Sequence, residues 1–162
     1  MKSEKKYKIL RLAVFLAVNF GAVAIGGLFT GKGVPSDWYQ NLDKAPWTPP
    51  GWVFGAAWTT IMIFFSVYMM AGWESVQNKK LFLGLFILQW VLNVSWNPTF
   101  FHFHQIFPAL MIISSLTALT GFFLLGFRSD LKLKSLLVLP YVIWLIIATS
   151  LNGYIFLNNP QH

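Results

Sequence analysis

Tryptophan, tyrosine and amide side chains are the groups in this sequence whose types and spacing best suit ligand binding. One set recurs at intervals of three and four residues, as expected of one helix face: Tyr141, Trp144, Ala148 and Asn152. Asn93, Trp96 and Asn97 form a second set of this kind. Because an amide is costly in hydrocarbon without a hydrogen-bond partner, both faces should point into the protein. The plainer interpretation is that these amides only hydrogen-bond helices together.

Indole rings around an uncharged cavity would suit a flat hydrophobic ligand. Trp58 lies well inside an apolar run, and its indole N–H needs a partner when it is buried. Met62, one turn later, is included among the candidate ligand-binding residues. Trp52, Trp73 and Trp90 are instead expected in aromatic belts at the two membrane interfaces.

A proline-rich segment, Ala45-Pro46-Trp47-Thr48-Pro49-Pro50-Gly51-Trp52, is the strongest local signature. Its prolines fix φ and remove backbone donors, so the chain should enter the following helix along a stiff path. We expect residues 30–50, called the lid below, to be ordered and to cover one mouth of a helical bundle. The lid residues placed near the ligand are Trp38, Tyr39, Trp47 and Pro49. The plainer interpretation is that the proline-rich segment is only a rigid turn.

Catalytic and metal-binding patterns are weak by comparison. His102 and His104 have a spacing that could hold a metal ion, but neither a carboxylate nor a cysteine accompanies them, and an interfacial loop is the preferred interpretation. No nucleophile, base and orienting group can be assembled, and no Gly-rich phosphate loop occurs. We therefore predict no catalytic residue, no resident metal and no required cofactor.

The elements that position these residues follow from composition. The chain of 162 residues is 56% hydrophobic and 10% charged, too few charges for a soluble surface. Apolar runs near the length of about 20 residues that spans a bilayer predict an all-α integral membrane protein with five transmembrane helices in one domain, residues 1–162. The expected spans are residues 9–29, 51–72, 81–101, 107–127 and 135–157. The last three connections are short, so consecutive spans should pack as antiparallel neighbours.

Charge predicts the topology. Ten of the twelve lysines and arginines fall on the side of the N-terminus and the second and fourth loops, which the positive-inside rule places in the cytoplasm. The C-terminus then lies outside, as expected for a multi-pass protein of a bacterial cytoplasmic membrane. The net charge of +7 forms no basic stripe with exposed aromatics, so no nucleic-acid partner is predicted. Without charged groups deep inside the spans, a proton-coupled transporter or ion pump is disfavoured.

Together these residues resemble the TspO/MBR family, the tryptophan-rich sensory proteins and translocator proteins. The resemblance covers residues 38–158 and is carried by the following motifs: Trp38-Tyr39, Lys44 to Pro50, Gly55 with Trp58, Leu92-Asn93 with Trp96-Asn97-Pro98, Pro140-Tyr141 through Trp144, Ala148-Thr149 and Leu151-Asn152.

The resemblance implies a five-helix bundle, usually a homodimer, that binds porphyrins such as protoporphyrin IX and haem beneath the first loop. It places Trp58, Trp144, Asn93 and Ala148 in the pocket, with Trp47 and Pro49 in the lid. Some relatives degrade protoporphyrin in light through those pocket tryptophans, so a weak activity of Trp58 and Trp144 is implied. The family's sterol motif is incomplete, because no basic residue follows Tyr154, and sterol binding is not expected.

From the sequence we therefore expect a membrane receptor or sensor for porphyrins. Two alternatives stay open: a transporter of porphyrins or other lipophiles, and a weak light-dependent porphyrin-degrading activity. The propionates of a bound porphyrin should reach toward the outer mouth, near Lys44 or the lid backbone. Whether His102 or His104 touches haem is left open at this point.

Overall fold

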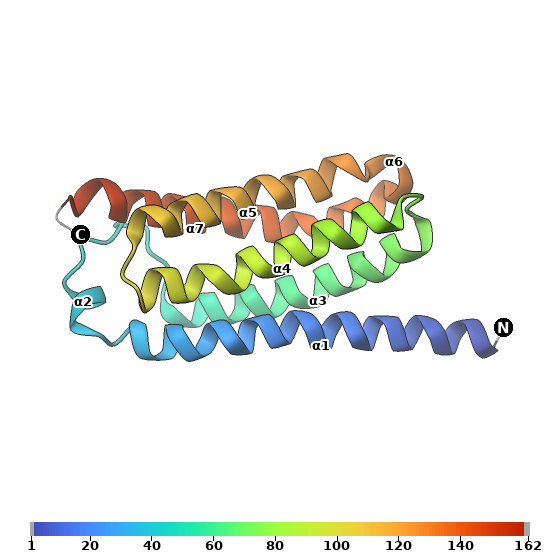
Figure 1. The fold of residues 1–162 in the computed structure, drawn as a ribbon, viewed down its shortest axis with the longest axis horizontal. Coiled ribbons are helices and arrows are strands. Elements are labelled where there is room, and N and C mark those ends of the chain that lie inside the picture. Colours follow the sequence, from blue (N-terminus) through green and yellow to red (C-terminus); the bar gives the residue numbers. More distant parts are fainter. Residues whose placement is uncertain (1, 161–162) are drawn as a thin grey trace.

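The computed structural model describes residues 2–160, and within that range the chain is helical without strands (Figure 1). Five helices are long and apolar enough to cross a membrane, the last of them counted from Arg128 to Asn158. The protein is therefore an integral, multi-pass membrane protein. The long helices are α1 (Lys2–Gly33), α3 (Gly51–Ser75), α4 (Lys79–Phe101), α5 (Ile106–Gly126) and α7 (Leu139–Asn158). The short elements are α2 (Asp37–Gln40), α6 (Arg128–Leu131) and the 3-10 helix η1 (Lys132–Val138).

The long helices form a ring in which α1 packs against both α3 and α4, and α5 packs against both α4 and α7. Helix α3 closes the ring through contacts with η1 and α7. The expectation that spans joined by short connections would be close neighbours holds only in part for α3 and α4: their backbones come close at few positions, although Gly72 and Tyr68 of α3 pack on Phe82 of α4. The reason is that α1 lies along both of them, as Figure 1 shows for the blue helix beside the green ones.

Helix α1 keeps one packing face along its length. Phe15 meets Phe86 of α4 edge to face, with ring centroids 5.4 Å apart. The buried Asn19 amide donates a 2.8 Å hydrogen bond to the Ser66 hydroxyl of α3. Gly26 lets the Asn97 side chain approach so closely that a Cβ at Gly26 would overlap it. These contacts are spaced by four and seven residues, so they lie on one face of α1 and fix it between its two neighbours.

Two features of the helices differ from expectation. The last span does not begin as an α-helix at residue 135, because η1 covers residues 132–138 and α7 starts at Leu139, with Pro140 in its first turn. Proline suits that position because its missing N–H has no partner in a helix's first turn. Trp90 is no interface residue, because it lies near the middle of α4 and donates a 3.0 Å hydrogen bond to the Val18 carbonyl of α1.

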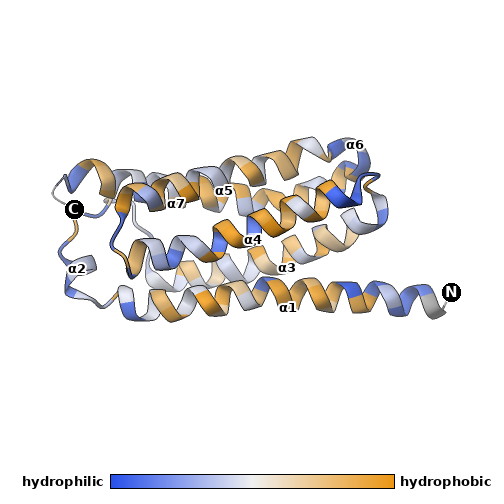
Figure 2. Ribbon diagram, viewed as in Figure 1, coloured by the Kyte–Doolittle hydropathy of each residue, from blue (hydrophilic) through white to orange (hydrophobic). Residues whose placement is uncertain are grey.

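Aromatic rings form much of the core at the end of the bundle away from the lid. Phe65, Phe82 and Phe123 are fully buried and meet one another or their neighbours largely edge to face. The Tyr68 hydroxyl donates a 2.7 Å hydrogen bond to the Phe123 carbonyl, so its polar atom is satisfied within the core. Gly72 of α3 lies directly against the Phe82 ring. Hydrophobic residues dominate the middle of all five long helices, and hydrophilic ones gather at the ends (Figure 2).

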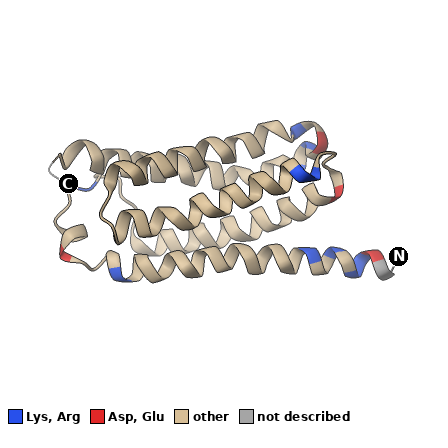
Figure 3. Cartoon of the chain, in the orientation of Figure 1, with Lys and Arg blue, Asp and Glu red and all other residues tan. Residues whose placement is uncertain are grey.

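The two ends of the bundle carry different charge. Lysines and arginines cluster at the end that holds the N-terminus, the α3–α4 turn and α6 (Figure 3). By sequence, this end has ten cationic and three anionic side chains, whereas the lid end has two of each sign. We refer to the first as the basic end. Its cytoplasmic placement stays a prediction of the positive-inside rule.

Candidate functional site

An apolar groove of about 500 Å³ runs between α3 and α7. It is lined by Val53, Ala56, Ala57, Thr60, Ile61, Pro140, Ile143, Trp144 and Ile147. Trp144 and Ile61 lie deep in it, 6% and 2% exposed, whereas Ile143 at the rim is 51% exposed. Small side chains on α3, Ala56 and Ala57, leave the space that larger residues would fill. Because Ala56, Thr60 and Ile143 at its rim are exposed on helices long and apolar enough to span a membrane, the groove opens on the lipid-facing side.

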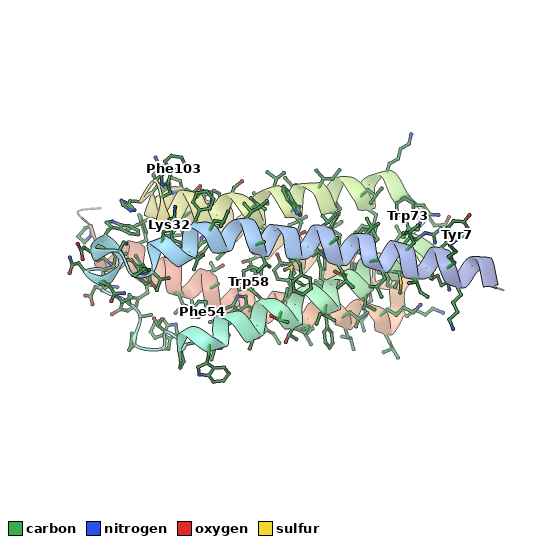
Figure 4. The ribbon with its side chains drawn as sticks, turned by 90° about the horizontal axis from the view of Figure 1, so that it is seen from below. Tyr7, Lys32, Phe54, Trp58, Trp73 and Phe103 are labelled. Atoms are coloured by element: carbon green, nitrogen blue, oxygen red, sulfur yellow. The ribbon has the colours of Figure 1, made fainter. Side chains whose placement is uncertain are left out.

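Aromatic contacts hold the groove's main ring in place. Trp144 meets Phe54 of α3 edge to face, with ring centroids 5.1 Å apart. Trp58 follows Phe54 by one turn on α3 (Figure 4). Its ring packs edge to face against Tyr141, with centroids 6.0 Å apart. Trp58 is half-buried and does not line the groove, so this groove contains only Trp144 of the two tryptophans that the resemblance places in the pocket. Trp58 instead lies behind it, against Tyr141.

Polar side chains from α4 and α7 meet inside the bundle. The Trp96 indole N–H donates to Asn152 Oδ1 at 3.2 Å, and Gln89 Nε2 donates to the Tyr141 hydroxyl at 2.8 Å. Asn152 Nδ2 and Gln89 Oε1 are buried without a partner among the described residues. Tyr141, Gln89 and Asn152 are each no more than 2% exposed. Each of these two atoms, Asn152 Nδ2 and Gln89 Oε1, keeps hydrogen-bonding capacity that the described residues do not use.

Gln89 is the inward-facing residue that sequence reasoning missed. It precedes Asn93 by four residues and Trp96 by seven, so it extends the same face of α4. That spacing was the available signal, and it could have identified an amide in the middle of an apolar run.

The remaining helix candidates have different environments. Asn93 is buried, 7% exposed, and its side chain hydrogen-bonds no other described residue. Asn97 faces α1 instead, where its Oδ1 accepts a 2.7 Å hydrogen bond from the Thr30 hydroxyl, so it joins helices as the plainer interpretation held. Met62 is fully buried in the core, and Ala148 is half-buried and packs against that core.

The first half of the lid packs on the end of α4. Trp38 meets Phe100 edge to face at 5.4 Å and stacks on the His104 ring at 4.1 Å. Tyr39 packs against Phe101 at 5.4 Å. Burial raises the pKa of the Tyr39 phenol above its ordinary value. The four residues 30–33 at the start of the lid continue α1, which ends at Gly33.

The second half of the lid reaches α7. The Trp47 indole N–H donates to the Ser150 hydroxyl at 3.2 Å, and its ring meets Tyr154 edge to face at 5.4 Å. Ser150 lies three residues beyond Ile147, so Trp47 is fixed about one turn from the lid-side end of the groove. Pro49 is half-buried, and Pro50 immediately precedes α3 with φ −57°. Trp47 therefore anchors the proline-rich segment to α7.

Lys44 has a structural role in the lid. Its ammonium donates to the carbonyl oxygens of Tyr39, Gln40 and Leu42 at 2.9, 3.0 and 3.2 Å. These are the backbone acceptors at the end of α2, where a cation is favourable. Since its three donors are taken, an approaching propionate would compete with the lid's own backbone for Lys44.

A reciprocal pair of hydrogen bonds ties the lid to the end of α7. The Asp43 backbone N–H donates to Asn159 Oδ1 at 2.9 Å, and Asn159 Nδ2 donates to the Asp43 carbonyl at 3.2 Å. We expect Asn159→Ala to speed hydrogen exchange in residues 41–47 by about fivefold or more, because each lost bond contributes about 1 kcal/mol. Hydrogen-exchange mass spectrometry of the protein in detergent measures it.

Asn158→Ala is the matched control for this prediction. The Asn158 amide donates within its own helix to the Tyr154 carbonyl and makes no hydrogen bond with the described residues of the lid. Lid exchange should stay at the wild-type rate in that variant. Equal acceleration in both variants would mean that fraying of α7, rather than the Asp43–Asn159 pair, controls the lid.

The histidines of the α4–α5 loop lie at the lid end, away from the groove. His102 and His104 are both exposed, and His104 adopts a positive φ of 55°. Within residues 2–160, no group of three or more metal-binding side chains comes together. Neither histidine lines the groove, so the groove lining contains no histidine ligand for a haem iron.

Fold and site together define a class of small polytopic membrane protein. Its members have an uncharged groove between two helices, with a tryptophan at the bottom, and a loop packed over one end of the bundle. The chain matches the model of the TspO/MBR family over residues 13–157 and belongs to that family. It is 32% identical to the protein CrtK of Rhodobacter capsulatus, over 91% of this chain and 92% of that protein.

Two further relatives extend the comparison. The tryptophan-rich protein TspO of Chlorobaculum tepidum is 31% identical, over 94% of this chain and 98% of that protein. The human translocator protein is 28% identical, over 89% of this chain and 86% of that protein. The similarity thus spans nearly the whole length of bacterial and animal relatives, and it agrees with the resemblance drawn from the motifs.

Proposed function

We infer that this protein is a membrane receptor or sensor that binds porphyrins, such as protoporphyrin IX and haem, and similar flat hydrophobic ligands. The observation that carries this inference is the groove between α3 and α7 with Trp144 at its floor. Its volume of about 500 Å³ falls in the range of small-molecule sites, roughly 300 to 1,000 Å³. Its lining is apolar apart from the Thr60 hydroxyl, which suits the face of a macrocycle.

The indole of Trp144 is the main contact in this proposal. Its N–H donates no hydrogen bond to a described residue, so it is free to donate to a ligand. Phe54 fixes the ring from one side, which reduces the entropy that a ligand would lose on binding. Because the lining lacks charge and histidine, the proposal concerns the porphyrin ring and not coordination of its iron.

The test is a titration of the purified chain in detergent with protoporphyrin IX, followed by porphyrin absorbance and tryptophan quenching. Binding should saturate at one ligand per chain. Trp144→Phe combined with Trp58→Phe should weaken it about fivefold, since Trp144 loses a direct ligand contact worth roughly 0.5 to 1.5 kcal/mol and Trp58 supports the groove from behind through Tyr141. Trp90→Phe is the control, because Trp90 hydrogen-bonds α1 outside the groove. Unchanged affinity in the double variant would remove the proposal.

Transport is the alternative in a different class, and the name of the human relative, translocator protein, motivates it. A transporter would accelerate porphyrin flux across proteoliposome membranes, whereas a receptor would bind without flux. Light-dependent degradation is distinguished in the same samples by product formation under illumination that Trp144→Phe abolishes while binding persists. The homodimer implied by the resemblance stays a prediction, which the mass of the protein in detergent tests.

A further inference from the structure

A second pocket, at the basic end, is unrelated to the groove. It has a volume of about 390 Å³ and lies where the start of α1 meets the α3–α4 turn. It is lined by Glu4, Tyr7, Lys8, Arg11, Trp73, Glu74 and Lys79. Figure 4 shows Tyr7 and Trp73 close together at this end, on α1 and α3. The pocket continues the packing face of α1 beyond Phe15, where that face changes from apolar to charged side chains.

Cations in this pocket outnumber anions. Lys8, Arg11 and Lys79 face two carboxylates, Glu4 and Glu74. The Glu74 carboxylate forms ion pairs with Lys8 Nζ at 3.2 Å, through Oε2, and with Arg11 Nη1 at 3.9 Å, through Oε1. Lys79 forms no ion pair with any described carboxylate. An anion that entered here would therefore meet positive charge that the protein itself does not neutralise.

The Trp73 indole lies near Arg11 and Lys79, the two cations of the pocket with the weakest ion pairing. The Arg11 guanidinium lies 6.0 Å from the Trp73 ring centroid, and the Lys79 ammonium lies 5.8 Å from it. Cation–π attraction holds each of them near the ring. The Trp73 indole N–H makes no hydrogen bond with a described residue, so it is a further donor at the same place. A guanidinium, an ammonium and an indole N–H together suit the oxygens of a phosphate group.

The surroundings favour a phosphate that is attached to a lipid. Val14, one turn after Arg11 on α1, is 52% exposed, and Ile9 and Leu10, which lie between Lys8 and Arg11 but further round the helix, are 60% and 57% exposed. Acyl chains can cover these side chains while the headgroup occupies the pocket. Trp73 is a half-buried aromatic residue near the end of α3, where such residues sit at headgroup level. Basic pockets between membrane helices are a known kind of anionic headgroup site.

We propose that this pocket binds the phosphate of an anionic phospholipid headgroup through Arg11, Lys79 and Trp73. Such a lipid would neutralise the surplus charge and join the start of α1 to the α3–α4 turn. Glu74 stays paired with Lys8 and orients the Arg11 guanidinium. Lys79 supplies the positive charge that no described carboxylate neutralises. The site lies at the opposite end of the bundle from the lid, so it is independent of porphyrin binding.

Native mass spectrometry of the full chain in detergent tests the proposal, with phosphatidylglycerol and phosphatidylcholine added at equal concentration. The wild type should retain one phosphatidylglycerol in preference to phosphatidylcholine. Lys79→Gln should weaken this binding about fivefold, from the contribution of one cation near anionic lipid. Lys80→Gln is the matched control, because it removes the same charge from the next residue, which does not line the pocket. Neither substitution breaks an ion pair to a described residue, so both variants should fold.

The outcomes separate the explanations. Equal losses in Lys79→Gln and Lys80→Gln would overturn the proposal in favour of nonspecific attraction to the basic end. Equal retention of the two lipids would overturn it as well. Inorganic phosphate is the third arm: at concentrations that match the lipid it should not displace phosphatidylglycerol, and complete displacement would assign the pocket to a soluble phosphate. A double variant, Arg11→Gln with Lys79→Gln, should lose the lipid preference altogether while its circular dichroism stays helical.

Discussion

Ala56→Phe is expected to reduce protoporphyrin affinity by roughly a hundredfold. Ala56 lies at the exposed rim of the groove, so a phenylalanine there can extend across the space above Trp144. The ring would cover on the order of 100 Å² of lining, and at about 25 cal/mol per Å² a ligand loses the equivalent of two orders of magnitude in affinity. Because the position faces lipid, the new side chain should not disturb the core. Titration with protoporphyrin IX in detergent measures the change.

Ala118→Phe provides the control for the blocked groove. Ala118 is an exposed alanine of α5 and takes no part in the groove lining. Its substitution adds the same ring to a lipid-facing surface, so affinity should stay within about twofold of the wild type. If Ala56→Phe bound porphyrin as tightly as the wild type, the ligand would have to bind elsewhere, with the polar residues between α4 and α7 as the next site to examine.

Gly72→Ala is expected to lower the stability of the fold by about 1 to 3 kcal/mol, the usual cost of overpacking a core. A Cβ at Gly72 would overlap the Phe82 ring, which is fully buried. Phe82 cannot move aside easily, because Phe127 and Phe123 meet it edge to face at 5.0 and 5.8 Å. Thermal unfolding in detergent, followed by circular dichroism, should show a melting temperature several degrees lower.

Gly84→Ala is the matched substitution on a neighbouring helix. An added Cβ at Gly84 meets nothing within 4 Å, and alanine is the better helix former by roughly 1 kcal/mol. This variant should therefore be as stable as the wild type or slightly more stable. A similar melting temperature in the two variants would show that the contact between Gly72 and Phe82 is looser than the structure indicates.

The fold was largely predictable from the sequence because membrane crossing leaves few options. A continuous apolar run can satisfy its backbone in lipid only as a helix, so the existence of five helices followed from composition. Helix neighbours were less predictable. Short connections favour sequential packing, but small residues such as Gly26 allow α1 to approach α4 closely, and α1 thereby lies along both α3 and α4.

The candidate site was predictable only in part. Helical spacing correctly put Tyr141, Trp144 and Asn152 on a buried face of α7. Spacing could not show that Asn97 turns toward Thr30 on α1, because that depends on the order of helices around the ring. Nor could it show that Trp58 lies behind the groove, since a side chain's depth is set by the neighbouring helix. Long-range packing, which leaves no local signal, decided these cases.

The lipid-facing opening between α3 and α7 has a consequence for how the protein would respond to its surroundings. A hydrophobic compound that enters through that side arrives from the hydrocarbon, with the lid still tied to α7. Occupancy then follows how much of the compound has dissolved in the membrane, and its aqueous concentration matters only through partitioning. The fraction of protein with a bound compound would then depend on the concentration of that compound in the surrounding bilayer. Binding constants measured in detergent therefore need to be converted to mole fractions before they are compared with those in the cell.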